Sequence, residues 1–414
     1  MATLVVRPGG LSADRYLRAG LEAVVLALVV ATPWALGAVE PLFFRFVLAG
    51  VAVLLLLWSA RLVVTGELRW RSCPGTLGLT GLFVLTLIQL IPLPSSVLSV
   101  AAPETRSLLH DLLPTVPETL PGDVPSAAAA DRPLSLYSGA TRDFLIQILA
   151  VFLIYVVVRQ QLASAATLRR LAWACLLNGV ALALFALCQA FSSPPNVVYG
   201  AFRVDGAVFG PFICRNHFPF YMHLCIGLGV GLLRPESPPD KRRARPRGSF
   251  EPGEVLAALQ SPRALGVLLA LGLMLAASAY SLSRGGVLAQ FAALVISAGV
   301  WWRSKVQPRG WLGAAAAAVL LAMLLGAWFG LTPLEDRLAT LADSDQLNNS
   351  RGQLWRNVLP LARRFPLVGT GNGTFAFVEP MTRDQPRTGV MFVHEFAHNE
   401  YLEALIEGGV IRLG

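Results

Sequence analysis

Long apolar stretches, separated by shorter polar segments, dominate the pattern of this chain. Several of them reach the ~20 residues that an α-helix needs to cross the hydrocarbon core of a bilayer. They lie at residues 21–38, 42–63, 76–92, 143–158, 171–191, 207–233, 264–280, 286–302 and 311–331. A further apolar helix is expected to begin near residue 400. The pattern predicts an all-α, polytopic integral membrane protein with about nine to ten transmembrane helices.

The composition agrees with this prediction. Of 414 residues, 55% are hydrophobic and only 14% are charged, whereas a soluble domain carries about 25% charged residues. The net charge of +9 could indicate a nucleic-acid partner, but the basic residues cluster in short loops instead of lining one face. We therefore expect membrane lipids, and no nucleic acid, as partners.

Basic residues occupy every second loop between the apolar stretches. The clusters lie near residues 7–18, 61–71, 159–170, 234–247 and 303–309. Positively charged loops stay on the cytoplasmic side, so the N-terminus is predicted to be cytoplasmic. The alternate loops then face outward. Residues 93–142, rich in proline and alanine, are expected to be irregular, and residues 332–397 form the longest outer loop.

The outer loop at 332–397 contains two local signals. Apolar residues from Leu354 to Leu361 recur at helical spacing after Ser350, a potential capping residue, and predict an amphipathic helix over 351–364. The glycines of residues 369–373 resemble a phosphate-binding loop, but a turn that needs positive φ is favoured over phosphate binding.

Residues 394–403 support two chemistries. From His394 they spell H-E-x-x-H, the zinc-hydrolase signature of two imidazoles one helical turn apart. That interpretation requires a helix already formed at His394, whereas Asn399 suits the N-cap of a helix that begins later. From His398 they spell H-N-x-Y-L-E, with an imidazole at the start of an apolar helix, where it suits proton transfer. We favour the second interpretation; a membrane zinc metalloprotease using His394, Glu395 and His398 is the alternative.

Three arginines stand at the outer ends of predicted spans. Arg203 and Arg215 lie at the start of the sixth span, and Arg284 lies between the seventh and eighth. Arginine this close to hydrocarbon is costly and usually faces a cavity or a partner, and its planar fork suits a diphosphate or a carboxylate. A functional role is favoured for Arg284, which has no acidic neighbour. For Arg203 and Arg215, a functional role is as well supported as a structural one, in which the side chain is an interfacial anchor or forms an ion pair with Asp205.

These features resemble the O-antigen ligase and O-antigen polymerase superfamily as an ordered set. The matching motifs are F-I-C-R-N-H-F at 212–218, S-L-S-R-G-G at 281–286, R-x-x-x-W at 351–355, P-L-V-G-T-G at 366–371 and H-N-E-Y-L-E at 398–403. The resemblance covers residues 201–414, including the loop 332–397, whereas residues 1–200 share only the hydropathy pattern. Cys214 and Pro219 depart from the usual asparagine and small residue. Such proteins continue for further spans, so we expect a fragment or a truncated product ending at Gly414.

The resemblance implies a metal-independent glycosyl transferase of the bacterial inner membrane, without cofactor and with its active site facing the periplasm. The donor is a glycan linked to undecaprenyl diphosphate, and the acceptor is lipid A-core, a glycan or a protein, so the enzyme is a ligase or a polymerase. A transporter of lipid-linked substrates is a further alternative, because it would also use intramembrane arginines.

The resemblance also implies roles for individual residues. The arginines of the motifs hold the donor diphosphate, and the histidine before the late helix is essential. The expected catalytic residues are His398, Arg284 and Arg215. The residues expected to bind substrate are Arg203, Asn216, Arg351, Trp355, Asn399 and Tyr401.

Overall fold

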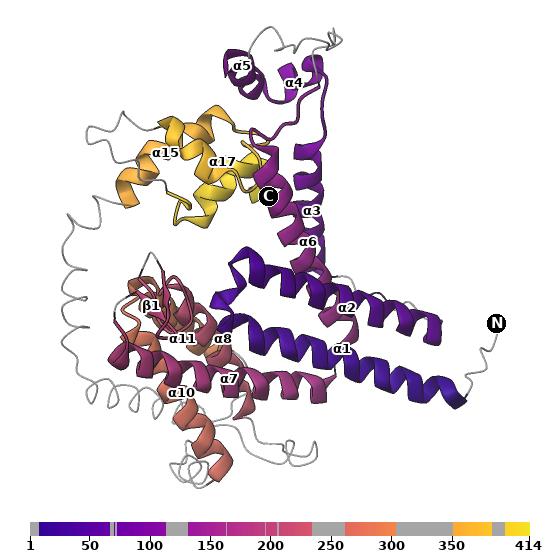
Figure 1. The fold of residues 1–414 in the computed structure, drawn as a ribbon, viewed down its shortest axis with the longest axis vertical. Coiled ribbons are helices and arrows are strands. Elements are labelled where there is room, and N and C mark those ends of the chain that lie inside the picture. Colours follow the sequence, from indigo (N-terminus) through magenta and orange to yellow (C-terminus); the bar gives the residue numbers. More distant parts are fainter. Residues whose placement is uncertain are drawn as a thin grey trace. The chain divides into compact units, whose positions relative to one another are not determined.

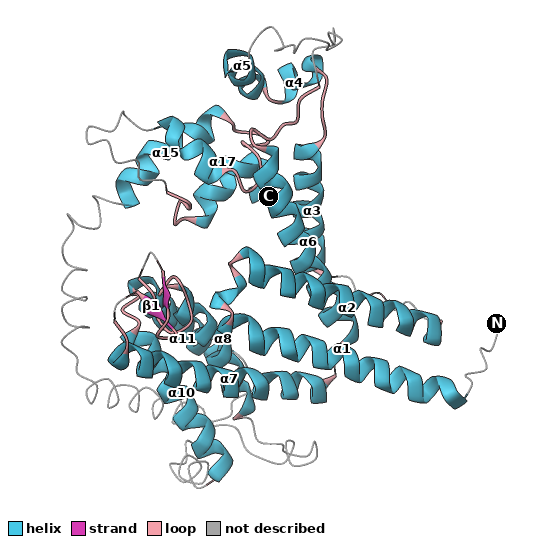
Figure 2. Cartoon of the chain, in the orientation of Figure 1, coloured by secondary structure: helices cyan, strands magenta, loops and turns pink. Residues whose placement is uncertain are grey.

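Helices make up nearly all the secondary structure in the computed structural model of the chain (Figures 1 and 2). The structure describes residues 8–66, 70, 73–112, 131–162, 164–194, 196–204, 207–233, 261–303, 351–382 and 394–414. The chain divides into two compact units. Unit 1 comprises residues 1–69 and 157–342, and unit 2 comprises residues 70–156 and 343–414. The boundary at residue 157 falls inside helix α6 (Ser138–Gln161).

Unit 1 is built around three apolar helices that pack pairwise. Its helices are α1 (Pro8–Trp34), η1 (Leu36–Ala38), α2 (Pro41–Thr65), α7 (Ala165–Ser192), α8 (His217–Leu232), α10 (Pro262–Tyr280) and α11 (Arg284–Arg303). The helices α1 and α2 run side by side (Figure 1). Leu182, Met222 and Met274, one from each of α7, α8 and α10, are fully buried in the shared core. Between α7 and α8, strands β1 (Val197–Val198) and β2 (Phe202–Arg203) form a short antiparallel hairpin.

Among the described residues, five helices are long and apolar enough to cross a membrane. They cover Ser12–Trp34, Pro41–Thr65, Ser138–Gln161, Ala165–Ser192 and Pro262–Tyr280. This confirms a mainly helical protein with membrane-spanning helices. The total of nine to ten spans stays a prediction, since the stretch 311–331 lies outside the described residues.

The apolar stretch 207–233 is not one helix, contrary to the sequence-based prediction. Gly210 has a φ of 59°, and an isolated bridge pairs Phe209 with Phe212. The Gly210-Pro211 turn breaks the chain, so that α8 begins only at His217. Residues 209–212 are buried in this turn, so their apolar character reflects burial and not a helix.

Unit 2 collects helices from two distant parts of the sequence. They are α3 (Pro74–Leu90), α4 (Ser95–Ala101), α5 (Pro103–Leu112), most of α6, α15 (Gln353–Arg364), α16 (Phe375–Val378), η4 (Glu379–Thr382) and α17 (Glu400–Leu413). The prediction of an irregular loop over 93–142 is wrong where α4 and α5 lie and where α6 begins at Ser138, whereas the described residues 131–137 are not helical, as predicted. Pro103 occupies the first position of α5, where the missing N–H costs no hydrogen bond, and Glu104 complements the helix dipole.

The amphipathic helix predicted over 351–364 is confirmed by α15. It begins at Gln353, after a wider turn at 351–352, and ends at Arg364. Its buried face packs on Phe375 and on Ile406 of α17. Ser350, the expected cap, lies outside the described residues. Ala397, which precedes α17, is buried in the same apolar cluster.

Candidate functional site

In unit 1, the segments that carry Arg215 and Arg284 meet at two helix N-termini. α8 starts just after Arg215 and Asn216, and α11 starts at Arg284, just after Ser283. The Ser283 hydroxyl donates to Asn216 Oδ1 at 2.8 Å and accepts a backbone N–H of the first turn of α11 at 3.1 Å. Ser283 thus caps α11 and joins it to the start of α8. It brings together motifs that are 67 residues apart in sequence.

The first turns of α8 and α11 are in direct contact. A Cβ at Gly286 would lie 2.5 Å from Pro219 Cγ, closer than side chains approach. Backbone N–H groups and the dipole at a helix N-terminus favour an anion, and guanidinium groups bind phosphate through two parallel hydrogen bonds. Two helix starts, each with an arginine in the adjoining sequence, therefore suit a polyanion such as a diphosphate.

The other predicted arginine of unit 1 lies on the hairpin. Arg203 is exposed and stands opposite Val197 in the register of β1 and β2. Arg215 is half-buried, and its backbone N–H donates to Ala207 O at 2.7 Å. The ion pair of either arginine with Asp205 falls outside the described residues.

In unit 2, the glycine segment 369–373 is a turn that packs on α17. The N–H groups of Thr370 and Gly371 donate to carbonyl groups of α17 at 2.9 Å each. Gly369 has a φ of 68°, and a side chain there would collide with the backbone of Glu407. These observations confirm the favoured interpretation of a turn requiring positive φ. The N–H groups of Thr370, Gly371 and Asn372 already have partners inside the protein.

A buried ion pair fixes α17 on this turn. Glu407, which is 2% exposed, accepts from Arg412 Nη1 at 2.6 Å and from the Phe375 backbone N–H at 3.0 Å. Arg412 also donates to Asn372 Oδ1 at 3.0 Å. A buried carboxylate is tolerated only when it is paired and hydrogen-bonded. These bonds hold the second half of α17 against the glycine turn.

His398 precedes α17 in an unusual conformation. Asn399 caps the helix, as predicted, with Oδ1 accepting the Leu402 N–H at 3.2 Å. His398 is exposed and has a φ of 51°, in the left-handed region that costs a residue other than glycine about 1 kcal/mol or more. The preceding residue, Ala397, is fully buried. The histidine therefore projects from an ordered turn.

Two side chains hold the peptide groups of Ala397. Its N–H donates to Glu403 Oε2 at 2.9 Å, and its C=O accepts from Trp355 Nε1 at 2.8 Å. Burial of Glu403 raises its pKa to about 7; the Ala397 N–H opposes this rise, and the neighbouring carboxylates Glu407 and Glu400 add to it.

The helix that the zinc interpretation requires is not formed. Residues 394–399 are not helical, and α17 begins at Glu400, so His394 and His398 do not share a helical face. In the part of the chain that the structure describes, no group of three or more His, Cys, Asp and Glu residues could hold a metal ion. The H-E-x-x-H interpretation thus lacks the geometry on which it depends.

Two further predicted residues, Tyr401 and Arg351, lie at the starts of α17 and α15. Tyr401 is 81% exposed in the first turn of α17, and Arg351 is exposed in the turn before α15. The joining role of Ser283 and the backbone contact of Glu403 were not predicted from the sequence. Ser283 had a signal, since serine before a helix start is a common cap. The contact of Glu403 depends on a non-helical chain at Ala397 and had none.

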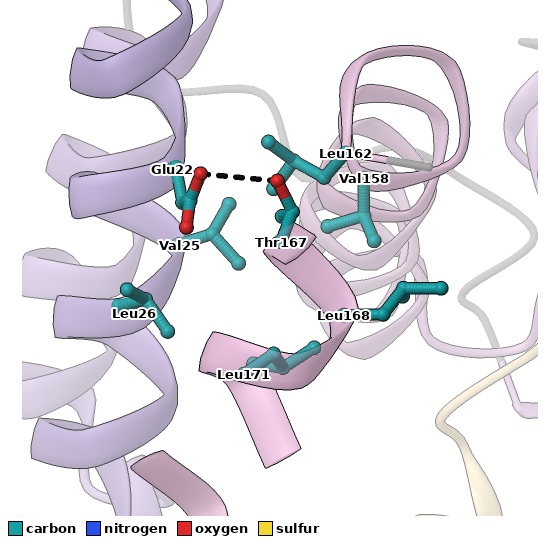
Figure 3. A pocket seen from close by; sticks show the side chains of 8 residues that line it. All are labelled: Glu22, Val25, Leu26, Val158, Leu162, Thr167, Leu168 and Leu171. Carbon is teal, nitrogen blue, oxygen red and sulfur yellow. Dashed lines mark hydrogen bonds between the residues drawn. The ribbon is translucent and has the colours of Figure 1, made fainter. Parts of the chain in front are cut away.

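A small pocket in unit 1 lies where α1, α7 and the end of α6 meet (Figure 3). Glu22 Oε2 accepts from the Thr167 hydroxyl at 3.1 Å and from Arg170 Nη2 at 2.7 Å. The other lining side chains are aliphatic, namely Val25, Leu26, Val158, Leu162, Leu168 and Leu171. Because its carboxylate is already paired and the rest is apolar, this pocket offers no group for catalysis.

Residues 269–413 match the family model for O-antigen ligase, which confirms the resemblance over this region. The match includes Arg284 and His398, whereas Arg203, Arg215 and Asn216 precede it. No curated protein matches the chain. No solved structure matches it either.

Proposed function

We propose, from the match of residues 269–413 to the family model for O-antigen ligase, that this membrane protein transfers a glycan from undecaprenyl diphosphate to an acceptor hydroxyl. The acceptor is lipid A-core, a growing polysaccharide or a protein. The reaction uses neither metal nor cofactor and takes place on the periplasmic face of the bacterial inner membrane. The alternation of basic loops supports this orientation.

The transfer exchanges one bond for another at the anomeric carbon of the donor sugar. The acceptor oxygen bonds to that carbon, the bond from carbon to the diphosphate oxygen breaks, and the acceptor proton moves to His398. Glu395 and Glu400, both exposed, are the competing candidates for this base. Negative charge develops on the leaving diphosphate. Arg284 and Arg215 stabilise it, because fixed positive charge at that point lowers the barrier.

The hydrogen bond from Ser283 to Asn216 is the observation that carries this proposal. It joins the two motifs that supply the arginines at two helix N-termini, a combination suited to a diphosphate. Arg203 and Asn216 support donor binding from the same unit. In unit 2, the exposed side chains of Arg351 and Tyr401, together with Trp355 and Asn399, support substrate binding around His398.

A deletion strain tests the proposal through its glycans. Deletion should leave glycan chains on the lipid carrier but not on the acceptor if the protein is a ligase, or single repeat units if it is a polymerase. Restoring the gene with Arg284→Ala should reduce transfer by about a hundredfold or more, whereas Arg106→Ala, an exposed arginine on α5, should restore it. Unchanged glycans after deletion would contradict the proposal.

A further inference from the structure

The peptide unit before His398 is held from both sides by side chains of different helices. Glu403, one turn into α17, accepts the Ala397 N–H at 2.9 Å, and Trp355 of α15 donates to the Ala397 carbonyl at 2.8 Å. Ala397 is fully buried in the cluster formed by α15, α16 and α17. These two hydrogen bonds satisfy the backbone of a residue that has no polar side chain of its own.

His398 follows these two hydrogen bonds, which we call the Ala397 clamp, and its backbone conformation is one that the surrounding structure must stabilise. Its φ of 51° lies in the left-handed region, which a residue with a Cβ occupies only when its surroundings determine it. On its other side, the cap from Asn399 Oδ1 to the Leu402 N–H fixes the start of α17. The backbone of His398 is thus bracketed by three side-chain-to-backbone hydrogen bonds.

We propose that Glu403 and Trp355 are positioning residues that set the place and direction of the His398 imidazole through the Ala397 peptide. This inference rests on the proposed function, in which His398 receives the acceptor proton. The Trp355 indole N–H is bound within the protein, so the substrate contact proposed for Trp355 involves its aromatic ring, which phenylalanine retains in part. A general base works only within hydrogen-bond reach of its proton, so a shifted imidazole lowers the rate.

The role of Glu403 is that of an acceptor for a backbone N–H, and a glutamine can fill it. Its carboxylate lies between Glu400 and Glu407 of its own helix, with Arg412 paired to Glu407. A neutral amide oxygen at the same position would still accept the Ala397 N–H. An alanine would leave that buried N–H without a partner, and the turn would relax.

The test combines activity with the chemical reactivity of His398 in the purified full-length protein. Glu403→Ala and Trp355→Phe should each lower kcat by roughly tenfold to a hundredfold, with little change in KM for the lipid-linked donor. Glu403→Gln should recover most of the activity lost in Glu403→Ala. The matched control is Arg356→Ala on the exposed face of α15, whose side chain donates to the carbonyl of Gly352, the residue just before the helix.

Acylation by diethyl pyrocarbonate, followed peptide by peptide, provides the second measurement. The rate at His398 should change in Glu403→Ala and Trp355→Phe, return towards wild type in Glu403→Gln, and stay constant at His110 in the same samples. If Glu403→Ala does not fold, Trp355→Phe tests the carbonyl side of the clamp independently.

The outcomes separate this inference from the proposed function. Wild-type transfer and His398 acylation in both Glu403→Ala and Trp355→Phe, with His398→Ala inactive, would overturn the positioning role alone. Full transfer in His398→Ala would overturn the role of His398 in the proposed function.

Discussion

At the scale of single residues, several buried polar side chains of unit 2 form hydrogen bonds with backbone groups of distant segments. Gln89 illustrates this: its amide donates to Val368 O and Glu407 O at 2.8 and 2.9 Å, and its carbonyl accepts the Asn372 N–H at 2.9 Å. Such bonds join segments that are far apart in the sequence and that no sequence pattern relates to each other. They were not predictable, because an amide inside an apolar stretch does not reveal which distant backbone it meets.

Glu403 makes the stability of unit 2 dependent on pH. Its pKa is raised from 4.5 to about 7, chiefly by burial. A raised pKa means that the folded state favours the protonated acid, so the associated stability is complete below 4.5 and is lost as the pH rises through 7. Between about pH 5 and pH 8, the Tm in detergent should fall more in the wild type than in Glu403→Gln. Equal falls would show that Glu403 does not titrate in this range.

At the scale of elements, periodicity predicted helices well and their interruptions poorly. The spacing of Leu354, Val358 and Leu361 located α15 to within about two residues. The hydropathy of 207–233 predicts one helix, because the apolar signal continues across the Gly210-Pro211 turn. Helix α17 is interrupted at Gly409, whose φ is 62°. No local signal distinguished that glycine from an ordinary helical one.

The contact between the glycine turn and α17 gives a prediction of stability. In Gly369→Ala, the new Cβ would meet the backbone of Glu407 and the residue would keep a positive φ. We expect a loss of about 2 kcal/mol or more, read from denaturant unfolding in detergent. The control is Gly78→Ala in α3, where no atom lies within 4 Å of the added Cβ, and its effect should stay within about 1 kcal/mol. Equal losses in both variants would contradict the packing.

At the scale of the whole molecule, hydropathy and charge predicted the class of protein but not its division into two units. Unit 2 joins residues 70–156 to residues 343–414, a pairing decided by long-range packing that hydropathy cannot register. The candidate residues divide accordingly: Arg203, Arg215, Asn216 and Arg284 belong to unit 1, and the residues around His398 belong to unit 2. Their order along the sequence, and not their spacing, was the informative signal.

The orientation in the membrane can be tested with two exposed serines. Ser107 lies on α5 within the predicted outer loop, and Ser261 precedes α10 beside the most basic loop. In a background without the native cysteines, Ser107→Cys should react with a membrane-impermeant maleimide in spheroplasts, and Ser261→Cys should react only after lysis. The reverse pattern would place the active site in the cytoplasm.

Transfer by the purified protein in liposomes tests the central claim most directly. The protein is supplied with a glycan linked to undecaprenyl diphosphate and with lipid A-core or a glycan as acceptor, and the glycosylated acceptor and released carrier are measured. Wild type and His110→Ala, an exposed histidine on α5, should transfer at equal rates, and His398→Ala should lose about a hundredfold or more. Equal transfer by His398→Ala, or no transfer by the wild type to any of these acceptors, would contradict the account.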